Sequence, residues 1–129
     1  MSNNITIIGA GPVGLVAGAL LAKLNFSVNI IEANHKEFIL KDSKALALSN
    51  STVFIFKKLD IWDELLKKAI PINEIHVSQK NTFGRTLFRA NDYEEDSLGY
   101  IVSYADLLKV LKNKIEVLQN VHIFFNTKL

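Results

Sequence analysis

The sequence contains no cysteine. Disulfide bonds, thiolate catalysis and cysteine-ligated metal sites are therefore excluded, and the composition fits a reducing compartment. The three histidines, His35, His76 and His122, lie far apart and show no metal-ligand spacing. We therefore predict no metal site in this chain.

An excess of charge of one sign is also missing. Lysine and arginine number 15 and aspartate and glutamate 13, so the formal net charge is +2, and the lysines are scattered. Nucleic-acid binding is not indicated, because it requires clustered basic residues. The longest apolar run, residues 13–22, is too short to span a bilayer and lacks the basic segment of a signal peptide. We therefore predict no transmembrane segment and a cytoplasmic location, with peripheral membrane association as a second option.

What the sequence does contain suits a single globular domain. The chain has 129 residues, of which 49% are hydrophobic. This share is ordinary for a folded protein and too high for a disordered one. The length is sufficient for one domain with its own core.

Residues 5–32 are the most informative stretch. An apolar run leads into the glycine-rich turn GAGPVG at residues 9–14, then a helix pattern of small residues, a second apolar run and Glu32. This order is typical of the βαβ unit that binds dinucleotides. A lone glycine motif would be a weak signal, but here every surrounding element agrees with it.

Each residue of the turn has a physical role in this interpretation. Gly9 ends the first strand at a tight turn, Gly11 lets the backbone approach a pyrophosphate, and Gly14 lets the helix lie close to the strand. Pro12 suits the first helical position, where its missing N–H costs nothing. The helix N-terminus then presents free N–H groups and a positive dipole to the phosphates.

Glu32 ends the second strand and is predicted to accept hydrogen bonds from ribose hydroxyls. A carboxylate at this position would repel the 2′-phosphate of NADP. The residues themselves leave NAD and FAD as alternatives, since both carry an unphosphorylated adenosine ribose.

The remaining residues alternate between helix and strand patterns. We predict helices at 51–59, 61–69 and 105–115, a hairpin within 73–90, and strands at 99–102 and 121–125. The last strand can join the parallel sheet beside the second one. The fold class is therefore α/β, a Rossmann-like βαβ fold that is incomplete, with residues 1–129 as one partial dinucleotide-binding domain. The hairpin at 73–90 is predicted to be the start of an inserted substrate subdomain.

Four segments occur in a recognisable order: GAGPVG with Glu32, DSKALALS at 42–49, IHVS at 75–78 and LGYIV at 98–102. Together they resemble the N-terminal part of FAD-dependent aromatic hydroxylases. The resemblance is closest to the ubiquinone-biosynthesis hydroxylases of the 2-polyprenyl-6-methoxyphenol hydroxylase type, and it covers essentially the whole chain.

The resemblance implies FAD as the cofactor, NAD(P)H as the electron donor, and O₂-dependent hydroxylation of a phenolic or prenylphenol substrate. It also implies that Lys44 lies near the flavin. The predicted cofactor-binding residues are Gly9, Gly11, Pro12, Val13, Gly14, Glu32, Ala33 and Lys44.

Three departures from the family pattern limit what the resemblance implies. Lys44 stands where the family usually has arginine, so the planar guanidinium group is lost. Ser103-Tyr104 stand where the family commonly has Glu-Asn. The two downstream motifs that complete the flavin site have no counterpart in this chain. No catalytic residue is therefore predicted.

Two other functional classes remain open at this point. One is an FAD- or NAD-linked dehydrogenase or disulfide reductase, although the missing cysteine argues against a reductase and the hairpin against a simple NAD dehydrogenase. The other is a truncated, non-catalytic dinucleotide-binding fragment. An incomplete sheet would also favour association through its exposed edge.

Overall fold

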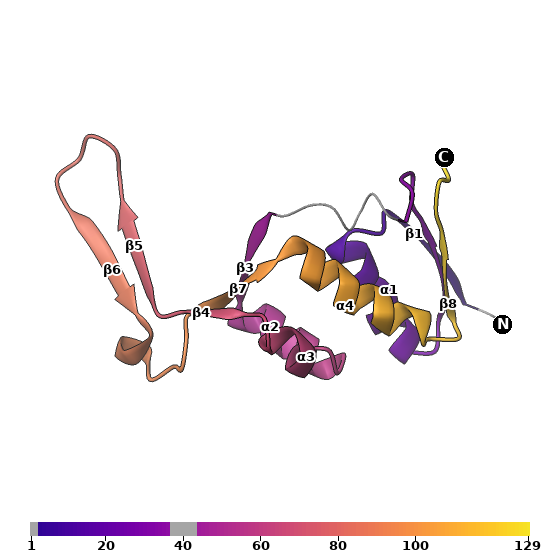
Figure 1. Cartoon of the computed structure of the whole chain (residues 1–129), viewed down its shortest axis with the longest axis horizontal. Helices are drawn as coiled ribbons and strands as arrows, with labels where there is room; N and C mark the ends of the chain where they lie inside the picture. The colour runs from indigo at the N-terminus through magenta and orange to yellow at the C-terminus, as the bar shows by residue number, and fades with distance from the viewer. Residues whose placement is uncertain (1–2, 37–43) are drawn as a thin grey trace.

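The computed structural model describes residues 3–36 and 44–129. A parallel sheet lies at one end of the molecule, helices and a second sheet lie in the middle, and a hairpin projects at the other end (Figure 1). This arrangement confirms the predicted mixed α/β class.

The parallel sheet holds the two strands of the βαβ unit and the last strand of the chain. These are β1 (Asn4–Ile8), β2 (Ser27–Ile31) and β8 (Val121–Phe124), in the order β1-β2-β8. The central strand β2 supplies Val28 and Ile30, which are fully buried. The prediction that the last strand joins the sheet beside the second one is confirmed.

Helix α1 (Pro12–Lys23) connects β1 to β2 and lies against the sheet. Gly18 sits on its buried face, where a Cβ atom would come within 2.9 Å of Ile30 Cδ1. A larger residue would therefore require the end of the Ile30 side chain to shift. The close helix–sheet contact that the sequence indicates is present.

The end of α1 is held by two asparagines. Asn25 adopts a left-handed conformation with φ of 64° just after the helix, a conformation that asparagine tolerates. Asn120 Nδ2 donates hydrogen bonds to the carbonyl oxygens of Ala22 and Phe26, at 3.0 and 2.9 Å. The second contact joins the start of β8 to the turn between α1 and β2.

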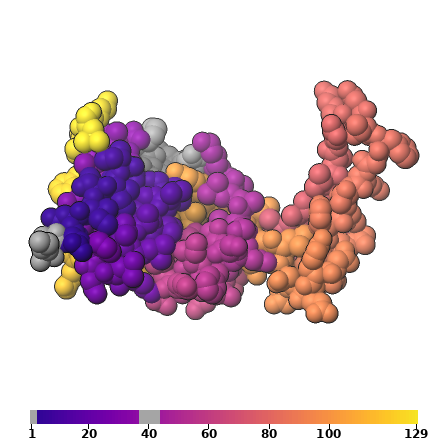
Figure 2. Space-filling model, turned by 180° about the vertical axis from the view of Figure 1, so that it is seen from behind, coloured from indigo at the N-terminus to yellow at the C-terminus, as the bar shows by residue number. Residues whose placement is uncertain are grey.

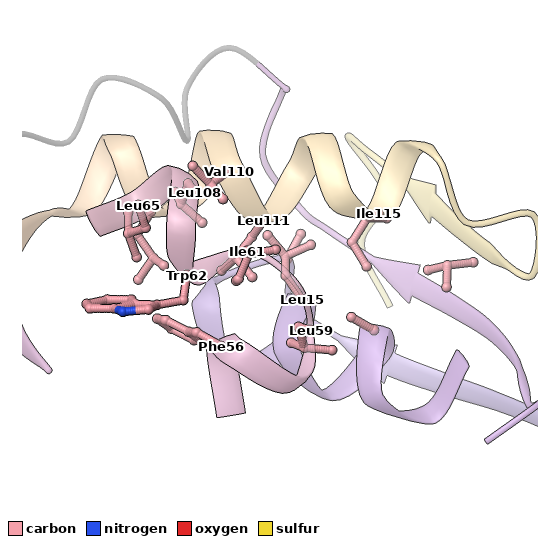
Figure 3. Close-up of a cluster of buried hydrophobic side chains, with 14 of the residues drawn as sticks. Leu15, Phe56, Leu59, Ile61, Trp62, Leu65, Leu108, Val110, Leu111 and Ile115 are labelled. Carbon is pink, nitrogen blue, oxygen red and sulfur yellow. The ribbon is translucent and has the colours of Figure 1, made fainter. Parts of the chain in front are cut away.

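Helix α4 (Tyr104–Glu116) runs from the second sheet to β8 and forms the middle of the core. Ser103 caps its N-terminus by accepting a hydrogen bond from Asp106 N at 3.4 Å. Figure 3 shows the apolar side chains that meet between α4, α1 and the two short helices. The buried set includes Leu15, Phe56, Leu59, Ile61, Trp62, Leu65, Leu108, Leu111 and Ile115.

The two short helices follow one another after residue 49. Helix α2 (Asn50–Lys58) lies one residue before the predicted 51–59, and Ser49 caps it, because its Oγ accepts a hydrogen bond from Thr52 N at 3.2 Å. Helix α3 (Trp62–Leu66) is shorter than the predicted 61–69. The prediction is wrong at its end, because residue 70 already begins a strand.

The second sheet is antiparallel and its full extent was not predicted. It contains β3 (Ala45–Ser49), β7 (Gly99–Ser103) and β4 (Ile70–Ile72) in the order β3-β7-β4. Only β7 was expected as a strand. Pro71 lies in β4 at the edge of the sheet, where a residue without an N–H is tolerated.

The predicted hairpin is present as β5 (Glu74–Ser78) and β6 (Arg85–Arg89). Of its strand residues only Leu87 is partly buried, and Figure 2 shows the hairpin standing apart from the rest of the molecule. A short 3₁₀ helix, Ala90–Tyr93, follows it. Its assignment to a substrate subdomain stays a prediction.

Candidate functional site

The glycine-rich turn lies at the carboxyl end of β1, where ligands of parallel sheets usually bind. Gly9 N donates a hydrogen bond to Ile31 O at 2.7 Å, which ties the turn to β2. Gly9 has φ of +102°, a conformation that side chains rarely adopt, yet a Cβ atom there would meet nothing within 4 Å. Glycine is needed here for the backbone conformation and not for lack of space.

Gly11 and Gly14 differ sharply in what surrounds them. A Cβ atom on Gly14 would lie 2.0 Å from the Gly9 carbonyl oxygen, so only glycine allows α1 to pass this close to the turn. A Cβ atom on Gly11 would meet only the Tyr104 hydroxyl, at 3.8 Å. The Gly11 side of the turn is therefore open, and a ligand can approach its backbone closely.

The open side of Gly11 coincides with the N-terminus of α1. Gly11 is the N-cap and Pro12 follows at the first helical position. Among the described residues, no side chain caps this terminus, and its first turn contains no acidic residue. The free N–H groups and the helix dipole are therefore left for an anion. A side chain at position 11 would fill the open space beside these uncapped amides. That space therefore fits a pyrophosphate.

Glu32 lies beside the turn and is 8% exposed. Its Oε2 accepts a hydrogen bond from Ala10 N at 2.8 Å, and its Oε1 accepts one from Asn34 N at 2.9 Å. The carboxylate therefore fixes the glycine-rich turn to the end of β2, a role that the sequence did not reveal. Each carboxylate oxygen can accept a second hydrogen bond, so capacity for a ribose remains.

The second sheet brings Lys44 and Tyr104 next to each other. The pairing of Ala45 with Ser103 places Lys44 opposite Tyr104, and Tyr104 N donates to Lys44 O at 2.8 Å. The Lys44 residue is exposed. Tyr104 is the residue that sequence reasoning missed, because position 104 entered only as a departure from a family pattern.

The other predicted positions lie around the same turn. Val13 is 84% exposed in the first turn of α1, and Ala33 is exposed next to Glu32. Asp42 and Ser43, which contribute to the resemblance, lie outside the described residues.

Within residues 3–36 and 44–129, no three acidic or histidine side chains come close enough to hold a metal ion. In the same part of the chain, no helix has the length and apolar character needed to cross a bilayer.

Comparisons with known proteins agree on one family. The FAD binding domain family matches residues 2–129. The chain is 24% identical to the ubiquinone biosynthesis monooxygenase COQ6 of Dictyostelium discoideum, over 94% of the chain and 28% of that protein. It is 28% identical to the kynurenine 3-monooxygenase of Legionella pneumophila, over 98% of the chain and 28% of that protein.

The fold is shared with a solved oxygenase structure. The structure of 2-methyl-3-hydroxypyridine-5-carboxylic acid oxygenase matches with a TM-score of 0.78 at 17% identity, over 99% of this chain and 32% of that one. The chain thus spans about a third or less of the length of these relatives. The family match covers residues 2–129, and the open glycine-rich turn lies at a helix N-terminus. The chain therefore belongs to the FAD binding domain family, and its cofactor is FAD.

Proposed function

We propose that this chain is the cofactor-binding part of a flavin-dependent monooxygenase that hydroxylates a phenolic ubiquinone precursor, with NAD(P)H as the electron donor. The observation that carries the proposal is the open side of Gly11 at the uncapped N-terminus of α1. The similarity to COQ6 supports the substrate class.

The proposed contacts divide between the two ends of the ADP moiety. Gly9, Gly11, Pro12, Val13 and Gly14 form the turn and the first helical turn, whose amides would bind the pyrophosphate. The positive end of the helix dipole offsets the charge of the phosphates.

Glu32 and Ala33 are proposed to hold the adenosine ribose. The hydrogen bonds from Ala10 N and Asn34 N fix the Glu32 carboxylate in one orientation before a ligand arrives. Lys44, directly before β3, adds a positive charge beside Tyr104 and is proposed to face the flavin side of the cofactor. When bound, FAD supplies the electron storage and oxygen chemistry, and the protein supplies orientation.

A second substrate class is favoured by the similarity to kynurenine 3-monooxygenase. That class is an aromatic amino acid in place of a prenylphenol. Both classes need the same cofactor site, so the residues above do not separate them. Product analysis with each substrate, in the presence of the remaining part of a flavin hydroxylase, would distinguish them.

The cofactor itself is the first test. The purified chain should release FAD on denaturation, identified by mass, or bind added FAD in a titration that quenches flavin fluorescence. Glu32 beside the turn argues against a 2′-phosphate. Recovery of NADP, or tighter binding of NADP than of FAD, would contradict the proposed site.

A further inference from the structure

We infer that the Tyr104 hydroxyl is a phosphate ligand of the dinucleotide site and completes the anion cradle opposite the helix N-terminus. The inference rests on the proposed function. Its basis is the position of Tyr104 Oη, which is the nearest group to a Cβ atom placed on Gly11, at 3.8 Å. The hydroxyl thus borders the open space beside the Gly11 backbone.

Tyr104 is held firmly at its backbone. It is the first residue of α4, and its N–H donates to Lys44 O at 2.8 Å. Ser103, directly before it, pairs with Ala45 and caps α4. Because rigid neighbours hold the residue, its hydroxyl has a defined place beside the turn and can contribute to binding without a large loss of conformational entropy.

The hydroxyl is available for a ligand. In the part of the chain that the structure describes, the Tyr104 side chain makes no hydrogen bond, and the hydroxyl is not sealed from solvent. A tyrosine hydroxyl donates one hydrogen bond, and a phosphate oxygen is an acceptor. Such charge-assisted hydrogen bonds are stronger than neutral ones.

The ring and the hydroxyl of Tyr104 have separable roles. The ring packs against the hydrophobic core, whereas the hydroxyl faces the glycine-rich turn. Replacement by phenylalanine keeps the packing and removes only the donor. The matched control is Tyr100→Phe, because Tyr100 lies on β7 with its ring 4.9 Å from that of Trp62.

The test compares ADP with adenosine, because only ADP carries the phosphates. Binding of each is measured by chemical-shift titration of the ¹⁵N-labelled full chain, a method that reaches millimolar dissociation constants. We expect Tyr104→Phe to weaken ADP binding about three- to tenfold, because one hydrogen bond is lost. Adenosine binding should be unchanged. Tyr100→Phe should change neither.

The outcomes separate this inference from the proposed function. If Gly11→Val abolishes ADP binding while Tyr104→Phe binds ADP as wild type does, the inference is overturned and the proposed site stands. If Tyr104→Phe weakens ADP and adenosine equally, the residue acts through structure and the inference is again overturned. If wild type binds no ADP, or Gly11→Val binds it normally, the proposed site itself fails.

Discussion

Gly11 and Gly14 lie three residues apart, yet the structure predicts opposite consequences for replacing them with valine. Gly11 has an extended backbone with φ of −73°, which any residue adopts, and its Cβ position is open. We expect Gly11→Val to fold, with a loss of about 1 kcal/mol at the helix cap, and to lose measurable ADP and FAD binding. Isothermal titration and urea unfolding measure the two effects.

Gly14→Val is the matched control for that variant. Its Cβ atom would lie 2.0 Å from the Gly9 carbonyl oxygen, so the turn or the helix must move. We expect a loss of more than about 3 kcal/mol in the free energy of unfolding. Binding by Gly11→Val at wild-type affinity, or equal stability of the two variants, would contradict the geometry described for the turn.

Glu32 combines a binding role with a structural one. Glu32→Ala would leave the buried Ala10 N–H without a partner, which costs about 1–3 kcal/mol of stability in addition to any lost affinity. Glu32→Gln keeps one acceptor oxygen and should lose less. Urea unfolding without nucleotide isolates the structural part, and an unchanged midpoint for Glu32→Ala would show that the hydrogen bond to Ala10 contributes nothing.

Among the elements, the hairpin contributes least to the core. Ala90 N donates to Asn73 O at 2.9 Å, so the residues that flank the hairpin are already neighbours. Residues 74–89 can therefore be replaced by a two-residue Asn-Gly turn. We expect the free energy of unfolding to change by less than about 1 kcal/mol, because the hairpin strands bury little.

Leu111→Ala provides the comparison for the hairpin replacement. Leu111 is fully buried in α4, and its truncation should cost about 2–5 kcal/mol. Urea unfolding of both variants tests the contrast. A hairpin deletion as damaging as Leu111→Ala would mean that β5 and β6 stabilise the central helices.

The elements that were predicted correctly are those that a short local sequence pattern specifies. The βαβ unit and the hairpin each have a short pattern that specifies them, and both are present. Strand β3 is only the pentapeptide ALALS, in which no polar residue alternates with the apolar ones, and β4 is three residues with a central proline. Neither therefore has a clear strand periodicity of its own. Both become strands through pairing with β7, a tertiary effect that local patterns do not contain.

The prediction of the dinucleotide site is limited in the same way, because local patterns do not contain tertiary contacts. The glycines and Glu32 were predicted from one continuous motif, and the structure places them around one turn. Tyr104 reaches that turn only because β3 and β7 carry the start of α4 there. A contact between residues 93 positions apart in the sequence has no signal in a single sequence.

For the molecule as a whole, we expect cofactor binding without hydroxylation when the 129-residue chain is assayed alone. Hydroxylation requires a substrate held in reacting geometry with water excluded. Here the space beside Gly11 is open, Lys44 is exposed to solvent, and the chain spans 28% of the length of COQ6. An assay with NADH, O₂ and a prenylphenol should yield hydrogen peroxide at most. Several turnovers of hydroxylated product per chain would contradict this expectation.

An apolar groove predicts self-association of the isolated chain. The groove has a volume of about 400 Å³ and lies between α1, α2 and β3, with Val13, Val16, Leu20, Leu46 and Ile55 among its lining residues. Exposed apolar surface of this kind favours association. Sedimentation velocity should show concentration-dependent oligomers, which Val13→Ser reduces.

Val117→Ser is the control, since Val117 is 72% exposed and does not line the groove. If neither substitution changes the oligomers, the association predicted through a sheet edge becomes the better account. Strands β1 and β8 are the candidate edges, because each has β2 as its one neighbour among the described strands.

The position of β8 has a consequence for synthesis of the protein. Strand β2 is complete at residue 31, but its second neighbour begins at Val121. During translation, one side of this strand therefore stays unpaired until β8 has left the ribosome. Since sheet pairings between distant segments form slowly, the nascent βαβ unit should need chaperone protection until β8 is made.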